Sequence, residues 1–211
     1  MDTEELKHFE HNRSIWDQWA SSMDSGGFRY KYLRKCQQGV ISLLSLKEDI
    51  SVLDIGCGTG YALGEIAKKA GNRGTFYGVD LSAKMIERAN EKFRDSEQFH
   101  FMVSNAESIP LEDNLFDIII CINSFHHYYH PEKAIAEMHR LLKDKGKVYI
   151  LDPTLDGFIF RAIDKLVRIF HQNHEKLHSS KEFKELMKNS GLNFIERRKI
   201  QIFQKIHIGQ K

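Results

Sequence analysis

The chain has 211 residues, a formal net charge of +2 at pH 7 and 41% hydrophobic residues. This size and composition predict one soluble globular domain with a sizeable core, and the small charge argues against nucleic acid or another polyanion as a partner. The three cysteines, Cys36, Cys57 and Cys121, form no C-x-x-C pair, so we expect a reducing cytoplasm rather than a disulfide framework. We also expect no signal peptide and no membrane helix, because the N-terminus is polar and no apolar run approaches about 20 residues.

The first 46 residues are predicted to form a helical cap on the core. Trp16 and Trp19 fall at helical spacing, and a second amphipathic helix is expected over Tyr30–Leu46. The tryptophan helix either packs its rings on the core or acts as a lid over a ligand. We expect a mixture, in which the helix packs and the glycine-containing loop Ser21–Phe28 moves.

A buried strand, residues 51–55, leads into Gly56, Gly58 and Gly60, and a helix pattern then begins at Tyr61. Glycines at this spacing let the backbone turn sharply and approach a ligand closely. A strand, a glycine turn and a helix start form the first unit of a nucleotide-binding α/β sheet. A plain glycine-rich turn is the alternative interpretation.

The next predicted strand, residues 74–79, ends at Asp80, about 20 residues past Gly60. At this offset an acidic side chain meets ribose hydroxyls, so the sequence predicts a ligand that contains adenosine. The alternative is that Asp80 caps the following helix, residues 82–93, although Ser82 is at least as well placed for that role.

The spacing of the glycines favours one adenosine ligand over another. Dinucleotide-binding turns carry G-x-G-x-x-G, whereas this chain has G-x-G-x-G with Asp54 two residues before the first glycine. A carboxylate there would repel a pyrophosphate but suits a cationic amine and a sulfonium. The sequence therefore predicts S-adenosylmethionine (SAM) rather than NAD.

Three more strands are expected at residues 99–103, 118–122 and 147–151. The continuous apolar run 118–122 fits a central parallel strand that is covered on both faces. The polar and aromatic segment 123–130 follows it, at the edge of the sheet where ligands of open α/β sheets bind. A helix over Pro131–Leu142 and a turn ending at Gly146 are expected to lead into the fifth strand.

The remaining residues are expected to add helices and a strand pair. Residues 157–170 read as a basic amphipathic helix, which we interpret as a surface helix rather than a membrane contact. His171, His174 and His178 have helical spacing but no completing ligand, so no metal site is predicted. A capped helix, residues 180–190, and a hairpin of two strands, 193–201 and 203–208, end the chain at the sheet edge.

Four motifs together resemble the class I SAM-dependent methyltransferases of the small-molecule type, such as the ubiquinone/menaquinone biosynthesis methyltransferases. They are V-L-D-I-G-C-G-T-G (52–60), G-V-D-L-S-A-K-M-I-E-R-A (78–89), and the stretches 105–117 and 130–146. The resemblance implies an α/β fold, a Rossmann-like three-layer αβα sandwich with a seven-stranded, mostly parallel sheet whose last strand is antiparallel.

We predict a single methyltransferase domain over residues 1–211. Its parts are an N-terminal helical cap (1–46), a cofactor-binding core (50–153), a helical insertion (154–178) and a C-terminal helix and strand pair (179–211).

The resemblance also implies a cofactor site. Residues 54–60 would line the methionine part of SAM, Asp80 would hold both ribose hydroxyls, and Met85 would lie beside the adenine unless it only fills the core. The full set is Asp54, Gly56, Cys57, Gly58, Gly60, Asp80, Leu81, Met85, Asn105, Ala106, Asn123 and Ser124. Asn105 stands where the family usually has Asp, but an amide oxygen still accepts a hydrogen bond from the adenine amine.

The expected reaction is methyl transfer from SAM to a small, partly apolar acceptor, with S-adenosylhomocysteine (SAH) as product. His126 and His127 are the candidate general bases because imidazole titrates near neutrality, although one of them could simply pack the loop. Tyr128 could orient the acceptor.

The nucleic-acid amino-methyltransferase signature D/N-P-P-Y/F is replaced by N-S-F-H at residues 123–126, and no feature sets an oligomeric state. The rival functions are a non-catalytic SAM-binding regulatory module and an NAD-dependent oxidoreductase.

Overall fold

The computed structural model of the chain describes residues 2–23, 27–156, 177–201 and 203–211. The predicted helix at 157–170, together with His171 and His174, lies outside the described residues. So does part of the loop Ser21–Phe28, namely residues 24–26. The lid motion expected of that loop stays a prediction.

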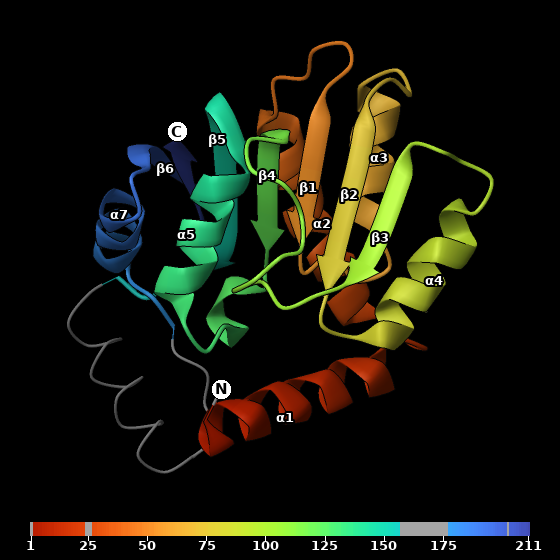
Figure 1. Cartoon of the computed structure of the whole chain (residues 1–211), viewed down its shortest axis with the longest axis horizontal. Coiled ribbons are helices and arrows are strands. Elements are labelled where there is room, and N and C mark those ends of the chain that lie inside the picture. The colour runs from red at the N-terminus through yellow and green to blue at the C-terminus, as the bar shows by residue number, and fades with distance from the viewer. Residues whose placement is uncertain (1, 24–26, 157–176, 202) are drawn as a thin grey trace.

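Seven strands form one mixed sheet in the order β3-β2-β1-β4-β5-β7-β6 (Figure 1). Strands β1 to β5 pair in parallel, whereas β7 runs antiparallel to both of its neighbours, β5 and β6. The predicted fold class is therefore confirmed. The strands are β1 (Ser51–Ile55), β2 (Thr75–Asp80), β3 (Phe99–Val103), β4 (Phe116–Ile122), β5 (Leu142–Pro153), β6 (Asn193–Gln201) and β7 (Gln204–Gln210).

Helices cover both faces of this sheet. One apolar cluster joins α5 and α7 to the sheet, and a second joins α2 and α3 to its other face. Helix α1 lies across the edge where the parallel strands end (Figure 1). The helices are α1 (Thr3–Trp19), α2 (Phe28–Leu43), α3 (Tyr61–Lys69), α4 (Ala83–Phe93), α5 (Pro131–Leu141) and α7 (Ser180–Asn189), with a short 3₁₀ helix, η1 (Phe125–His127).

Strand β4 is the centre of the core, as its unbroken apolar run predicts. Ile119 and Cys121 belong to one cluster, and Ile118 and Ile120 belong to the other. Because alternate side chains point to opposite faces, both faces of β4 are buried under apolar side chains. The carboxyl end of β4 is therefore held rigidly at the edge of the sheet that α1 covers.

Helix ends follow the expected signals. Ser82 caps α4 by accepting a hydrogen bond from the Met85 N–H at 3.1 Å. Ser179 and Glu182 form the predicted capping box at the start of α7, and Pro131 opens α5. These caps satisfy backbone donors that a helix leaves unpaired at its start.

The fifth strand is longer than predicted. It begins at Leu142, directly after α5, so the segment expected to be a turn up to Gly146 is part of β5. The reason is long-range pairing: the Lys145 N–H donates to the Lys211 carbonyl at 3.2 Å, and the Lys211 N–H donates to the Gly146 carbonyl at 3.1 Å. The C-terminal residue thus extends the strand backwards.

Asp117, near the start of β4, joins neighbouring segments at the edge of the sheet that lies opposite α1. It accepts a hydrogen bond from the Ser51 N–H at 3.0 Å and pairs with Lys47 at 2.7 Å and Lys143 at 2.9 Å. Burial opposes the charged form, but the two lysines and the amide outweigh it and lower the pKa of Asp117 to about 2.

We expect Asp117→Asn to lower the free energy of unfolding by about 2 kcal/mol at pH 7. Because the folded pKa lies below the unfolded value of about 3.9, this contribution is fully present above pH 4 and is lost as the pH falls through 2. Urea unfolding of both proteins at pH 7 and pH 2 measures the difference. An equal difference at the two pH values would contradict the assignment.

Candidate active site

A cavity of about 360 Å³ opens where β1, β2 and β4 end. The strand order reverses here, because the chain runs outward from β1 through β2 to β3 on one side and through β4 to β5 on the other. Ligands of open α/β sheets bind at such a switch point. Predicted site residues that line the cavity are Gly56, Cys57, Gly58, Asp80, Leu81, Met85, Asn105, Ala106, Asn123, Ser124, His126 and His127. Asp54 and Gly60 are not on its wall.

All three glycines of the turn adopt a backbone conformation that favours glycine, and two of them also have no room for a Cβ. Gly56, Gly58 and Gly60 all have left-handed φ angles, of 79°, 54° and 76°, which other residues adopt at a cost. A Cβ on Gly56 would also collide with the Ser124 side chain, and one on Gly60 would lie 2.9 Å from the ring of Phe101. A Cβ on Gly58 would meet only the Met23 methyl, at 4.0 Å, so Gly58 presents bare backbone to the cavity.

Asp80 links the glycine turn to the start of α4. Its Oδ2 accepts the Gly58 N–H at 2.9 Å, and its Oδ1 accepts the Ser82 N–H, also at 2.9 Å. Burial raises the pKa of Asp80 above its ordinary value, although these two N–H groups favour the charged form. Each carboxylate oxygen has a second lone-pair direction, so the side chain can still accept hydrogen bonds from a ligand.

Asp54 lies behind the glycine turn. The side chain is 2% exposed, and its Oδ1 has no hydrogen-bond partner among the described residues. Burial, and then the nearby charge of Asp80, raise the pKa of Asp54 to about 8. In the absence of a cation it is therefore mostly protonated at neutral pH, which the sequence argument from a charged carboxylate did not anticipate.

The residues after β4 form the far wall of the cavity. Asn123 has a left-handed φ of 54°, and its side-chain amide makes no hydrogen bond of normal geometry within the described part of the chain. The Tyr128 hydroxyl lies 3.0 Å from Ser124 Oγ and donates to the Ile55 carbonyl at 3.4 Å. Burial raises the pKa of Tyr128, so this hydroxyl stays neutral and supports the turn.

The two candidate bases lie in different surroundings. His126 Nδ1 is 2.8 Å from Oδ1 of Asp152, a fully buried carboxylate at the end of β5. The His127 ring packs edge-on against Trp16, with ring centroids 5.0 Å apart. The His127 carbonyl lies 2.8 Å from His8 Nε2. His126 is thus linked to the sheet, and His127 is linked to α1.

The sequence analysis offered the tryptophan helix, now α1, as a possible lid over a ligand, but it assigned no site residue to α1 or α2. These helices and Tyr61 add lining residues, among them Asn12, Arg34 and Gln37. The Arg34 guanidinium lies over the Tyr61 ring at 3.4 Å from its centroid, next to the glycine turn. Arg34 and Gln37 are three residues apart on one helix face, a polar pair that could have indicated a ligand-facing side.

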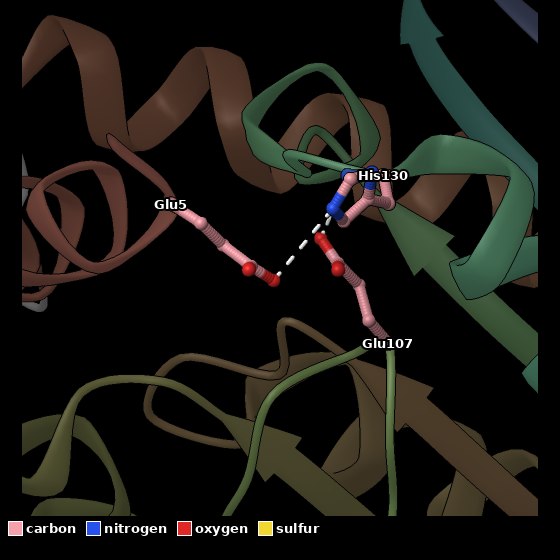
Figure 2. Close-up of side chains that lie close together, drawn as sticks. All are labelled: Glu5, Glu107 and His130. Carbon is pink, nitrogen blue, oxygen red and sulfur yellow. Dashed lines mark hydrogen bonds and ion pairs between the residues drawn. The ribbon is translucent and has the colours of Figure 1, made fainter. Parts of the chain in front are cut away.

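Helix α1 is attached to the core at both ends. Figure 2 shows Glu5 and Glu107 converging on His130. The ring Nε2 of His130 lies 3.6 Å from Glu5 Oε1, and the backbone N–H of His130 donates to Glu107 Oε1 at 2.8 Å. At the other end, the Ser82 hydroxyl donates to Asp17 at 2.5 Å.

The ligand atoms of Glu5, Glu107 and His130 lie within 4.8 Å of one another, as those of a metal site would. We assign the group a structural role, because Glu5 and Glu107 each pair with His130 and so join α1 to the core.

Residues 53–150 match the family described as the methyltransferase domain. The matched residues make up a little under half of the chain and include the glycine turn, β2 and β4. Over 131 residues the chain is 32% identical to the ubiquinone/menaquinone biosynthesis C-methyltransferase UbiE of Citrifermentans bemidjiense, covering 59% of this chain and 56% of that protein. It is 27% identical to UbiE of Paraburkholderia phytofirmans, and this match covers 82% of this chain and 77% of that protein. The chain spans 41–56% of the first three curated relatives that it matches.

The fold has solved counterparts. A chain of the complex between the Haloferax volcanii Trm112 methyltransferase activator and a methyltransferase superposes with a TM-score of 0.79, covering 92% of this chain and 96% of that one. At 19% identity this shows a likeness of fold alone. In the parts of the chain that the structure describes, none of the helices has the length and apolar character of a membrane span.

The raised pKa of Asp54 predicts a pH-dependent stability. Because the folded pKa, about 8, exceeds the unfolded value of about 3.9, the contribution of this group is greatest below pH 4 and is lost as the pH rises through 8. Without cofactor, the stability of Asp54→Asn relative to the wild type should therefore increase from pH 5 to pH 9. The change in the difference between their free energies of unfolding should be on the order of a few kcal/mol. Urea unfolding at both pH values tests this, and a pH-independent difference would refute it.

Proposed function

We propose that this protein transfers a methyl group from SAM to a small-molecule acceptor. The observation that carries the proposal is the Asp80 carboxylate bonded to the Gly58 amide on one cavity wall. The two groups present an acceptor for hydroxyls beside a stretch of backbone that no side chain covers. A nucleoside such as SAM fits this pair. Its ribose hydroxyls would donate to the carboxylate, and its methionine part would lie along the bare backbone.

The residues around this pair fit the rest of the cofactor. Leu81 and Met85 would lie beside the adenine, and Asn105 and Ala106 would meet its edge. Asn123 and Ser124 would border the methionine part, where the Asn123 amide is buried and available. When bound, the cofactor supplies a methyl group already activated by a sulfonium. The protein has to hold the acceptor in line with it, an effect worth about 7–11 kcal/mol at best.

Arg34 would hold the carboxylate of the methionine part. Among the described lining residues it is the one arginine or lysine, and its stacking on Tyr61 places its charge beside the glycine turn. A planar guanidinium binds a carboxylate through two parallel hydrogen bonds. Arg34 would thus provide charge complementarity for the end of the cofactor opposite Asp80.

The acceptor would lie between α1 and the loop after β4. Phe9 and Trp16 of α1 and Leu33 of α2 give this part of the cavity apolar walls, which favours a small, partly apolar molecule. His126 would act as the general base. The small net charge of +2 argues against a nucleic-acid acceptor. The UbiE relatives, named for ubiquinone and menaquinone biosynthesis, agree with a small acceptor.

We further propose that residues 1–211 form one domain with the parts predicted from the sequence. The thiols of Cys36, Cys57 and Cys121 are all free and buried, which suits the reducing cytoplasm that we infer as the location.

Calorimetry with SAH tests the cofactor site. We expect wild-type protein to bind SAH and Asp80→Asn to bind it about 10–100-fold more weakly, because a neutral amide accepts fewer and weaker hydrogen bonds from the ribose. Asp95→Asn, at an exposed position, is the matched control and should bind as wild type. Unchanged affinity in Asp80→Asn would rule out the ribose assignment, and tight binding of NAD instead of SAH would favour an oxidoreductase.

A second titration tests Arg34. Arg34→Gln should weaken SAH binding about tenfold while leaving the affinity for 5′-methylthioadenosine unchanged, since that nucleoside lacks the amino-acid end. Lys35→Gln, at the exposed neighbouring position of α2, should affect neither ligand. Equal losses for both ligands in Arg34→Gln would show that the arginine supports the fold rather than the carboxylate.

A further inference from the structure

Asp152 is a buried carboxylate that packing alone does not explain. It is 0% exposed; Oδ1 contacts His126 Nδ1 at 2.8 Å, and Oδ2 has no hydrogen-bond partner among the described residues. Burying a carboxylate with one oxygen unpaired costs folding free energy. Charged groups kept in such positions are characteristic of functional sites.

The topology brings this carboxylate to the cavity. Strands β4 and β5 pair in parallel, with Ile122 opposite Leu151, so the residues that follow the two strands meet at the same edge of the sheet. Asp152 comes from β5, and His126 comes from η1, which follows β4. The His126 ring lines the cavity, and the carboxylate lies on its inner side.

We infer that Asp152 is a positioning residue that fixes His126 as the general base of the methyl transfer. The inference rests on the proposed function and adds a residue to it. A carboxylate at Nδ1 holds the ring in the tautomer with a proton on Nδ1, which puts the basic lone pair on Nε2. It also stabilises the imidazolium that forms when Nε2 takes a proton.

The surroundings of His127 suit a different role. Its ring packs on Trp16, and its carbonyl accepts a hydrogen bond from Asn12 at 3.3 Å. Both contacts belong to α1. His127 therefore helps to hold α1 over the cavity. His126, whose ring centroid lies 4.0 Å from that of His127, is the histidine oriented for proton transfer.

This arrangement narrows the class of acceptor. The proton of an acceptor hydroxyl, or of an acidic C–H, passes to His126 Nε2 while the acceptor atom forms a bond to the methyl carbon. The methyl–sulfur bond breaks, its electron pair stays on sulfur to give SAH, and the imidazolium then loses its proton to water. A neutral amine already has the lone pair with which it attacks, so an oxygen or carbon acid depends more strongly on a base at this position. We therefore assign an oxygen or carbon acid as the acceptor.

Nitrogen NMR of histidine-labelled protein tests the pair without any acceptor. The titratable groups that the described structure places against His126 are Asp152 from β5 and His127 from η1. In wild-type protein, the His126 ring should be the Nδ1–H tautomer, assigned by its loss in His126→Gln. In Asp152→Asn its titration midpoint should move to lower pH, because the imidazolium loses its carboxylate partner. Asp144→Asn, at an exposed position of the same strand, should leave the midpoint unchanged.

Two results would overturn the inference: an Nε2–H tautomer in the wild type, which needs no variant to observe, or an unchanged midpoint in a folded Asp152→Asn. SAH calorimetry separates the failure of this inference from the failure of the proposed function. If wild-type protein does not bind SAH, the proposed function is rejected whatever the NMR shows. Transfer of labelled methyl to oxygen or carbon, reduced about 10²–10⁴-fold in His126→Gln, would support the acceptor class. Transfer to an amine, unaffected by that variant, would overturn it.

Discussion

The hydrogen bonds of one carboxylate, Asp80, determine the shape of the site. Asp80 joins the Gly58 amide of the turn after β1 to the Ser82 amide that precedes α4. The parallel pairing of β1 and β2 makes this possible, since Ile55 lies opposite Val79 and the Val79 carbonyl accepts the Gly56 N–H at 2.8 Å. Without this carboxylate, two backbone donors at the cavity wall would lose their partner, so the bare backbone at Gly58 and the acidic side chain beside it form one unit.

Helix α1, which covers the cavity, is coupled to the same unit. Asp17 of α1 accepts a hydrogen bond from Ser82, two residues beyond Asp80, and the other end of α1 is attached through His130. Phe9, Asn12 and Trp16 project from the helix between these attachments into the cavity. A ligand that forms hydrogen bonds with Asp80 would therefore bind next to one of the contacts that hold α1 in place.

Local patterns in the sequence predicted much of the fold and several residues that line one wall of the cavity. The glycine turn, Asp80 and the apolar run of β4 were identifiable because glycine spacing, an acidic residue at a strand end and uninterrupted hydrophobicity are signals within one segment. The start of β5 was wrong because Lys145 pairs with Lys211, a contact that no local pattern contains. The first residues of β5, from Leu142 to Gly146, could therefore be assigned only from the structure.

The remaining site residues depend on contacts between distant segments. Arg34 faces the cavity because α2 packs beside Tyr61, and Asp152 meets His126 because β4 and β5 are neighbours. Asp54 was assigned to the ligand from its motif, but its burial, with an exposed fraction of 2%, depends on how the whole turn packs. The sequence can name an acidic residue, whereas only the fold decides whether it faces a ligand or lies behind one.

The most direct measurement is a crystal structure of the protein grown with SAH. The account predicts the nucleoside in the cavity between β1, β2 and β4, with both ribose hydroxyls bonded to Asp80 and its chain running along the bare backbone at Gly58. A nucleoside bound elsewhere, or a cavity closed by its own side chains in the presence of saturating SAH, would contradict it.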